Sequence, residues 1–400
     1  MQAIIEKIFN NKKFNLIAFV LIAGLILIAY SNTFYATFHF DDNPSIVENA
    51  YIKRLTLENI KYLITTNRPV VNLTLMLNYQ LGGLNVVGWH IFNIGCHIAN
   101  SFFVYLLILW TLNLPSMAKQ YSDKARRMAL FGALLFGVHP IQTESVTYII
   151  TRTELLATFF YLGAFLLFIK GARTGKFAYY SGAACSAFLS AGSKEWAVTL
   201  PAVLFLYDVL FLSQGKIKPA LSRWKAYALL ALSWVQIYRT VNLFTPGSSV
   251  GFSMTDKIGA ASDSTVSWTA WTYLLTSFNV IWTYIRLLFL PINQNLDYSY
   301  PVAESLFEFP TLMSFIGHIV VVGAAFWLYK KKAWTLIPFG VAWFYVTLSP
   351  TQSFVPVKDV IFEHRLYIPS IGFFIAFVVA YEMIFDWFAR RAKQTVKSES

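Results

Sequence analysis

The stretch "FNLIAFVLIAGLILIAYSNTF", residues 14–34, decides the fold class of this chain. It contains no charged residue, and a helix needs roughly 20 mainly apolar residues to cross the hydrocarbon of a bilayer. Lys7, Lys12 and Lys13 precede the stretch, and no small-residue cleavage motif follows it. We therefore interpret it as an uncleaved signal anchor.

The rest of the chain repeats this pattern. Of its 400 residues, 56% are hydrophobic and only 13% are charged, and the mean hydropathy is +0.53. These values lie outside the range of soluble domains, so the sequence predicts an all-α polytopic membrane protein with about 10 or 11 transmembrane helices. The spans that fit are residues 14–34, 87–112, 128–139 with neighbours, 154–170, 177–192, 196–212, 225–244, 311–329, 334–349 and 367–388.

One further apolar stretch, residues 268–290, is also long enough to cross. A single crossing there would place Lys330, Lys331 and Lys332 on the outer side, against the rule that basic loops stay in the cytoplasm. We therefore favour an interfacial or re-entrant segment. The alternative is eleven spans with one loop that breaks the rule.

Basic residues collect in the loops on one side of this arrangement. The positive-inside rule makes that side cytoplasmic, which places the large loops 36–86 and 245–310 outside. The net charge of +12 therefore reflects membrane topology, and no nucleic-acid partner is expected. The basic clusters are Lys7, Lys12 and Lys13; Lys119, Lys124, Arg126 and Arg127; Lys170, Arg173 and Lys176; Lys216, Lys218, Arg223 and Lys225; Lys330, Lys331 and Lys332; and Arg390, Arg391, Lys393 and Lys397.

The first outer loop contains an amphipathic helix. Thr56 is a suitable N-cap, Glu58 lies in the first turn, and Leu57, Ile60 and Leu63 follow at helical spacing. This pattern predicts a helix that lies on the membrane surface.

The same loop begins with "FHFDDNPSI", residues 38–46, in which Asp41 and Asp42 stand at the outer membrane boundary. A carboxylate at that depth is costly unless it is paired or takes part in chemistry. The simpler interpretation is a solvated turn before Pro44.

Every other outward corner also carries acid and base together. Any one of these groups could be a salt bridge or a headgroup anchor. Together, the cations suit an anionic group such as a phosphate, and the carboxylates suit proton abstraction from a hydroxyl. The corner residues are His139 and Glu144; Arg152 and Glu154; Lys194 and Glu195; and Lys358, Glu363, His364 and Arg365.

The segments "FHFDDNPSIVEN", "HPIQTESVTYIITRTELLATFF", "SKEWAVTLPAVLFLYD" and "EHRLYIPSIGF" together resemble the transmembrane and tetratricopeptide-repeat (TMTC) protein O-mannosyltransferases and their bacterial relatives. The resemblance implies a GT-C glycosyltransferase that takes sugar from a polyprenyl phosphate with inversion. It implies that Asp41 or Asp42 is the catalytic base and that Arg365 contacts the donor phosphate. The other matching positions, expected to bind donor phosphate or sugar, are Lys194, Arg152, His139, Glu144, Glu195 and His364.

The family normally continues into tetratricopeptide repeats, and this sequence contains no such repeat after residue 390. We therefore expect a transmembrane glycosyltransferase domain over residues 1–390 and a cytoplasmic tail over 391–400. The acceptor is expected to be a protein Ser or Thr, or a glycan. The membrane is a bacterial inner membrane or the endoplasmic reticulum, with the active site on the periplasmic or lumenal face.

Asp41 is the first choice as base, and Asp42 could orient the donor sugar. The pair could also hold Mg²⁺ or Mn²⁺, although a monophosphate donor beside an arginine is expected to need no metal. Two alternatives stay open. A GT-C transferase could modify a lipid or a polysaccharide, and a lipid-sugar transporter would place its charges at the bilayer midplane.

Overall fold

The computed structural model describes residues 13–243, 269–331, 335–357 and 359–398, and in this part of the chain the regular elements are helices and no β-strand occurs. The predictions for Lys7, Lys12, Lys332, Lys358 and residues 245–268 lie outside this part of the chain. Among the described residues, five helices are long and apolar enough to cross a membrane. The chain is a multi-pass, all-α membrane protein, as its composition predicts.

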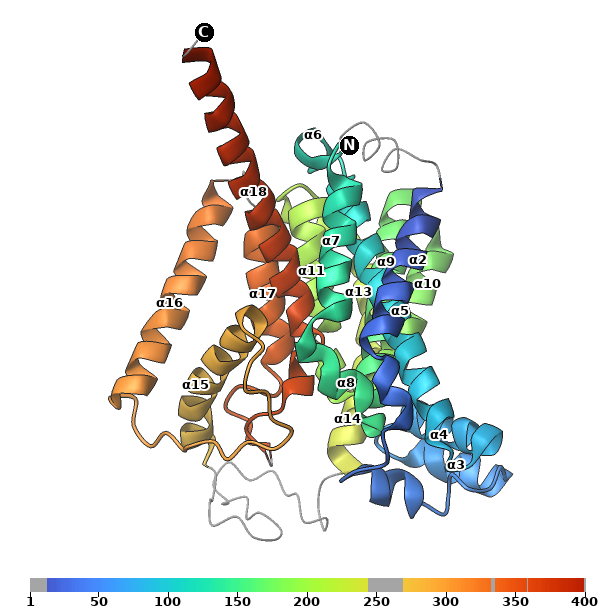
Figure 1. Ribbon diagram of the computed structural model, residues 1–400. Coiled ribbons are helices and arrows are strands. Elements are labelled where there is room, and N and C mark those ends of the chain that lie inside the picture. The colour runs from blue at the N-terminus through green and yellow to red at the C-terminus, as the bar shows by residue number, and fades with distance from the viewer. Residues whose placement is uncertain (1–12, 244–268, 332–334, 358, 399–400) are drawn as a thin grey trace.

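The helices form an elongated bundle (Figure 1). α6 (Ala118–Tyr121) and the far end of α18 (Pro369–Ser398) lie at one end of it, which carries predicted cytoplasmic residues. α3 (Leu57–Thr65), α4 (Pro69–Gly82) and α8 (Thr143–Thr147) lie at the other end, which we call the outer end. Besides α15, which is described below, the other α-helices are α2 (Phe14–Ala29), α5 (Val86–Leu112), α7 (Ala125–Val138), α9 (Arg152–Thr174), α10 (Phe177–Ala191), α11 (Leu200–Tyr207), α12 (Ile217–Leu221), α13 (Trp224–Ala231), α14 (Ser233–Leu243), α16 (Phe309–Lys330) and α17 (Leu336–Leu348).

Buried polar residues on α5 hold the outer end of the bundle together. His90 Nε2 lies 2.9 Å from the carbonyl oxygen of Ala36, and Asn93 donates to the carbonyl of Ile149 over 3.2 Å. His97 lies one helical turn after Asn93, and its Nε2 is 2.9 Å from the carbonyl oxygen of Gly137. A buried backbone carbonyl without a partner is costly, so these bonds fix where three separate chain corners lie.

α17 and α18 pack at close range through two glycines. A Cβ at either Gly340 or Gly372 would collide with the carbonyl oxygen of the other residue. Small residues let membrane helices approach closely, and Trp343 adds a bond of 2.9 Å from its indole N–H to the carbonyl of Ile368. The contact fixes the start of α18, which comes two residues after the segment "EHRL", Glu363–Leu366.

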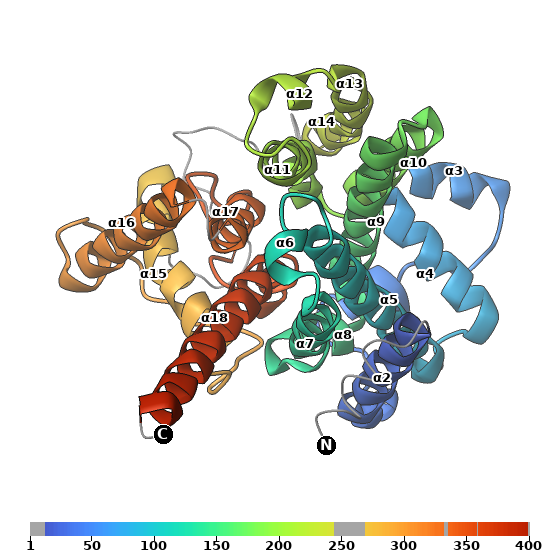
Figure 2. The same cartoon turned by 90° about the horizontal axis from the view of Figure 1, so that it is seen from above.

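α15 (Ala270–Phe289) covers most of the ambiguous stretch 268–290. It rises from the outer end at a tilt, and the chain then returns to the outer end before α16 begins (Figure 1). This path agrees with the re-entrant segment favoured from the basic residues at Lys330 and Lys331. Seen from above, α15 and α16 stand to one side of the bundle (Figure 2).

The amphipathic helix of the first outer loop is confirmed as α3. The hydroxyl of Thr56 accepts the backbone N–H of Asn59 over 3.2 Å, which is the predicted N-cap. Leu63 is buried, whereas Leu57 and Ile64 are exposed. The helix thus has apolar side chains available for a membrane surface, which remains a prediction.

Candidate functional site

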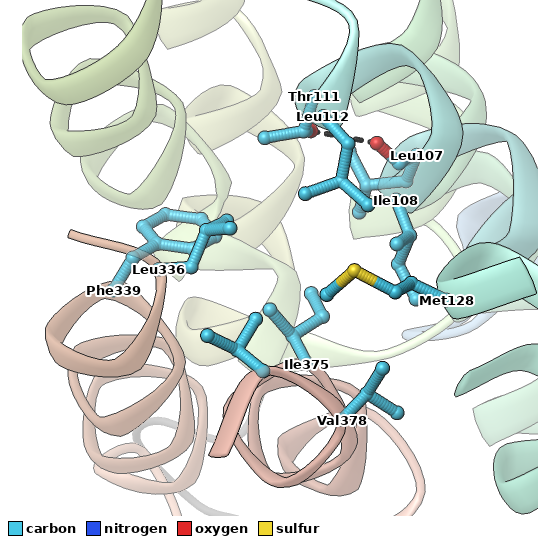
Figure 3. A pocket seen from close by; sticks show the side chains of 10 residues that line it. Leu107, Ile108, Thr111, Leu112, Met128, Leu336, Phe339, Ile375 and Val378 are labelled. Atoms are coloured by element: carbon cyan, nitrogen blue, oxygen red, sulfur yellow. Dashed lines mark hydrogen bonds between the residues drawn. The ribbon is translucent and has the colours of Figure 1, made fainter. Parts of the chain in front are cut away.

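Two cavities differ sharply in their chemistry. One, of about 10 Å³, lies between α5, α7, α17 and α18 and is lined almost entirely by aliphatic and aromatic side chains (Figure 3). Its polar member is Thr111, whose hydroxyl bonds to the carbonyl of Leu107 over 2.6 Å. No titratable group lines this cavity, so it is a packing defect rather than a site.

The second cavity, of about 310 Å³, opens at the outer end and contains three carboxylates. Four chain segments that are far apart in the sequence form its walls. The lining residues are Ala36, Thr37, His39, Asp42, Thr143, Glu144, Thr147, Tyr148, Gln294, Asn295, Leu296 and Glu363. Its size and its buried acids make it the candidate active site.

Asp42 is fixed in the cavity wall by two backbone bonds. Its Oδ1 accepts the N–H of Ile150 over 2.8 Å, and its Oδ2 accepts the N–H of His39 over 3.1 Å. The side chain is buried. Burial raises the pKa of Asp42 to about 6, and the two N–H bonds offset this only in part. Such a carboxylate is ionised at neutral pH and basic enough to accept a proton.

Asp41 has a different environment although it is adjacent in sequence. It is exposed, and its backbone N–H donates to the Tyr148 hydroxyl over 2.8 Å. Asp41 is not among the residues that line the cavity. The structure therefore separates the pair: Asp42 forms part of the wall, and Asp41 lies at the outside.

Glu144 and His364 form a close pair on another side of the cavity. Glu144 Oε1 lies 2.5 Å from His364 Nδ1, and its Oε2 accepts the His364 backbone N–H over 2.8 Å. Burial raises the pKa of Glu144 to about 7, and burial lowers the pKa of His364 to about 3. The imidazole is thus uncharged at neutral pH, and the pair can hold a proton close to the cavity.

Glu363 holds residues 294–298, a wall of the cavity that the sequence did not predict. This buried carboxylate accepts the Asn295 N–H over 2.8 Å, the Tyr298 hydroxyl over 2.5 Å and the Gln294 amide over 2.5 Å. Gln294 also donates to the carbonyl of Pro140 over 3.1 Å. Residues 294–298, which follow α15, are therefore held against the segment that contains His364.

Two of the predicted cations, Lys194 and Arg365, lie near Glu144. Lys194 Nζ is 3.1 Å from Glu154 Oε1, and Arg365 holds its own segment by donating to the carbonyls of Asp359 and Val360 over 2.7 and 3.1 Å. Both cations are close enough to Glu144 to lower its pKa in part. Neither cation lines the cavity, so their expected contact with a donor phosphate stays a prediction.

Glu195 and a residue missed by sequence reasoning extend this group. Arg68 at the start of α4 binds Glu195 with two hydrogen bonds, from Nε over 3.1 Å and from Nη2 over 3.2 Å. The Trp196 indole donates to Glu154 over 2.6 Å. Salt bridges therefore occupy this corner, as the simpler interpretation of acid and base together expects.

Arg152 is enclosed away from the cavity, which corrects its expected place beside a donor phosphate. Its guanidinium is fully buried and donates to Asn93 over 3.1 Å and to Asn78 over 2.8 Å. It also lies 4.0 Å from the centre of the Phe92 ring. Because α4, α5 and α9 surround it, Arg152 positions helices.

His139 likewise has a local structural task. Its Nδ1 accepts the N–H of Ile141 over 3.2 Å, and its ring packs against Phe374 at 5.3 Å between centroids. It therefore caps the turn before α8 and contacts α18. It does not line the cavity.

Asp41 and Asp42 show no metal-binding arrangement in the part of the chain that the structure describes. No group of three or more His, Cys, Asp or Glu residues is placed to hold a metal ion there. Both carboxylate oxygens of Asp42 already accept backbone N–H groups. The residues present do not fit a two-aspartate metal site.

Sequence reasoning missed several residues of the cavity. Gln294 and Asn295 lie in an irregular polar stretch after α15, which carries no periodicity or motif. Tyr148 follows Glu144 in a segment already singled out, but a tyrosine at a membrane boundary usually serves as an anchor. Only the packing of distant segments identifies these residues.

Comparison with known proteins assigns relatives to this chain. No family model matches it, and no solved structure matches it. It is 26% identical to the human "Protein O-mannosyl-transferase TMTC3" over 90% of this chain and 42% of that protein. It is also 26% identical to the Caenorhabditis elegans "Protein O-mannosyl-transferase F38B6.6" over 91% of this chain and 51% of that protein. The chain is similar to these TMTC proteins over most of its length.

The human "Protein O-mannosyl-transferase TMTC2" gives a third match, at 29% identity over 71% of this chain and 35% of that protein. The chain thus spans about half the length, or less, of these TMTC relatives.

Proposed function

We propose that this chain is an inverting glycosyltransferase that moves a sugar from a polyprenyl-phosphate donor to a hydroxyl group at the outer end of the bundle. The observation that carries the proposal is the outer cavity, in which Asp42 and Glu144 are buried carboxylates. The names of the relatives support mannose as the sugar and a protein as the acceptor.

Asp42 is the better base of the two adjacent acids. A hydroxyl is a poor nucleophile unless a base removes its proton during attack. The Asp42 carboxylate lines the cavity, two N–H groups fix its orientation, and its pKa of about 6 suits this role. Asp41, the first choice from sequence, is exposed and does not line the cavity.

The transfer step then follows in balanced form. The acceptor oxygen forms a bond to the anomeric carbon from the side opposite the phosphate, while its proton passes to Asp42. The bond from the anomeric carbon to the phosphate oxygen breaks, and the electron pair stays on the phosphate. The charges of Lys194 and Arg365 act on Glu144 in this site. In this proposal they also stabilise the departing phosphate anion.

Transport is a weaker proposal. A transporter would place its charged groups near the bilayer midplane, whereas the titratable groups described above collect at the outer end. Transfer to a lipid or a polysaccharide would use the same residues, and the choice of acceptor distinguishes these cases.

A transfer assay with matched variants tests the proposal. Purified protein in detergent receives a Thr-containing peptide and radiolabelled polyprenyl-phosphate mannose or GDP-mannose. We expect label in the peptide from the lipid donor only, and equal rates with and without EDTA. Asp42→Asn should lower the rate by on the order of 10² to 10⁴-fold while donor binding persists.

Asp41→Asn is the matched control, because it removes one charge at the adjacent position. It should keep most of the activity. If Asp41→Asn abolishes transfer and Asp42→Asn does not, the roles are reversed. Transfer from GDP-mannose in the absence of lipid would overturn the proposed donor.

A further inference from the structure

Tyr148 lies at the wall of the outer cavity, close to several carboxylates. It lines the cavity and is half-buried, and its hydroxyl oxygen accepts the Asp41 N–H over 2.8 Å. Burial raises the pKa of this hydroxyl, and the nearby carboxylates of Asp41, Asp42 and Glu144 raise it further. The hydroxyl is therefore within range of all three acids, and it keeps its proton at neutral pH.

The proton of this hydroxyl is available to a bound molecule. A phenol donates one hydrogen bond and can also accept, and the Tyr148 oxygen already accepts the Asp41 N–H. In the described part of the chain, no group accepts a hydrogen bond from Tyr148. Tyr284 differs, because its hydroxyl accepts the Phe362 N–H over 3.0 Å and donates to the Phe362 carbonyl over 2.8 Å. Tyr148 is therefore a fixed hydrogen-bond donor whose acceptor a ligand can supply.

The charges around the cavity indicate which kind of oxygen this donor meets. Among the described residues that line the cavity, Asp42, Glu144 and Glu363 are acids, His39 has the one basic side chain, and none is a lysine or an arginine. Like charges repel, so a phosphate oxygen is disfavoured beside Tyr148. A neutral hydroxyl oxygen carries no such penalty, and a sugar ring carries several of them.

The position of Tyr148 places this hydroxyl oxygen on the donor sugar. In the proposed reaction the acceptor oxygen contacts both Asp42 and the anomeric carbon, and reacting atoms approach to roughly 3–3.5 Å. The sugar ring therefore lies close to Asp42, on the cavity side of the wall. Tyr148 lines the same cavity within range of Asp42 and Glu144.

We infer that the Tyr148 hydroxyl donates a hydrogen bond to one ring hydroxyl of the donor sugar, and that it thereby selects the sugar and positions it beside Asp42. This inference rests on the proposed function and specifies the sugar-binding side of that site.

Donor analogues that each lack one hydroxyl of the mannose ring test the inference. The kcat/KM of each analogue is compared with that of polyprenyl-phosphate mannose in wild type and in Tyr148→Phe. In wild type we expect one analogue to react about tenfold more slowly than the mannose donor, because it lacks the oxygen that Tyr148 binds. In Tyr148→Phe the mannose donor should lose about the same factor, and that analogue should then react as fast as mannose.

Tyr284→Phe is the matched control, because it removes a hydroxyl that also accepts a backbone N–H but does not line the cavity. The analogues should keep their wild-type order in this variant. If Tyr148→Phe transfers too slowly to measure, displacement of bound donor by each analogue gives the same comparison.

Equal relative losses for every analogue in wild type and Tyr148→Phe would overturn the inference, since Tyr148 would then only hold the Asp41 backbone. Equal wild-type rates for all analogues would overturn it as well. A wild-type protein that transfers nothing from the lipid donor would instead overturn the proposed function.

Discussion

At the scale of single residues, neighbouring acids acquire different chemistry from their surroundings. Asp42 is buried and fixed by two N–H groups, and Asp41 is exposed at the next position. Three basic residues also differ in their surroundings. Arg152 is sealed among helices by its hydrogen bonds, whereas Lys194 and Arg365 remain near Glu144. Residue type alone therefore does not assign a role at these corners.

The raised pKa of Asp42 predicts how the rate depends on pH. A base works only when ionised, so kcat/KM should fall about tenfold per pH unit below a midpoint near 6. An ordinary aspartate would place the midpoint near 4. A rate profile of the purified enzyme between pH 4 and 8 measures this.

Glu144→Gln distinguishes the two buried acids in that profile. Its residual activity should keep the midpoint near 6, because Asp42 is unchanged. Loss or displacement of the midpoint in this variant would assign the titration to Glu144, whose pKa of about 7 is also raised by burial.

At the scale of elements, short irregular segments at the helix ends form the site, and the long helices place them. α5 fixes three corners through His90, Asn93 and His97. α15 contributes through the stretch that follows it, residues 294–298, which Glu363 ties to the segment before α18. The site therefore depends on how firmly that stretch is held.

Glu363→Gln should loosen this stretch. In the wild-type protein the Asn295 N–H donates to the buried Glu363 carboxylate. A hydrogen bond to a charged group contributes about 1.5–3 kcal/mol. We expect amide exchange at Asn295 to become at least about tenfold faster, with a lower transfer rate. Hydrogen exchange read by mass spectrometry over residues 290–300 measures the change.

Glu308→Gln is the control for that experiment. Glu308 accepts the N–H groups of Glu304 and Ser305 over 2.9 Å each, so it holds a nearby part of the same connection. Exchange at Asn295 should not change in this variant. Equal exchange at Asn295 in wild type and Glu363→Gln would show that Glu363 does not hold the wall.

At the scale of the whole molecule, the path of α15 determines which end of α16 faces the cytoplasm. Because the chain after α15 returns to the outer end before α16 begins (Figure 1), Lys331 should lie on the cytoplasmic side with Lys119. The segments that carry Asp42, Glu144 and Glu363 then share one end of the bundle, which the cavity requires.

Single cysteines test this topology in a background in which Cys96 and Cys185 are replaced. An impermeant thiol reagent applied to intact cells should label Glu48→Cys and Glu58→Cys, both exposed at the outer end. Lys119→Cys and Lys331→Cys should stay protected until the membrane is permeabilised. Labelling at Lys331→Cys with protection at Lys119→Cys would mean that α15 crosses as an eleventh span.

The sequence by itself determined the membrane class, the helix that begins after Thr56 and the segments from which the charged residues of the site come. Of the ten expected spans, five correspond to helices in the described residues that are long and apolar enough to cross a membrane. Apolar length, caps and loop charge are properties of contiguous residues, and the transfer of such segments into lipid depends little on their partners. The resemblance of several segments to TMTC proteins added the type of chemistry to be expected.

Only the tertiary structure decided which of these charged residues meet. Asp42 bonds to Ile150, 108 positions away, and Glu144 bonds to His364, 220 positions away. Such contacts depend on helix packing and on the pairing of buried polar groups, which no local pattern encodes. For this reason Asp42 rather than Asp41 lines the cavity, Glu363 with Gln294 and Asn295 joins it, and Arg152 is excluded from it.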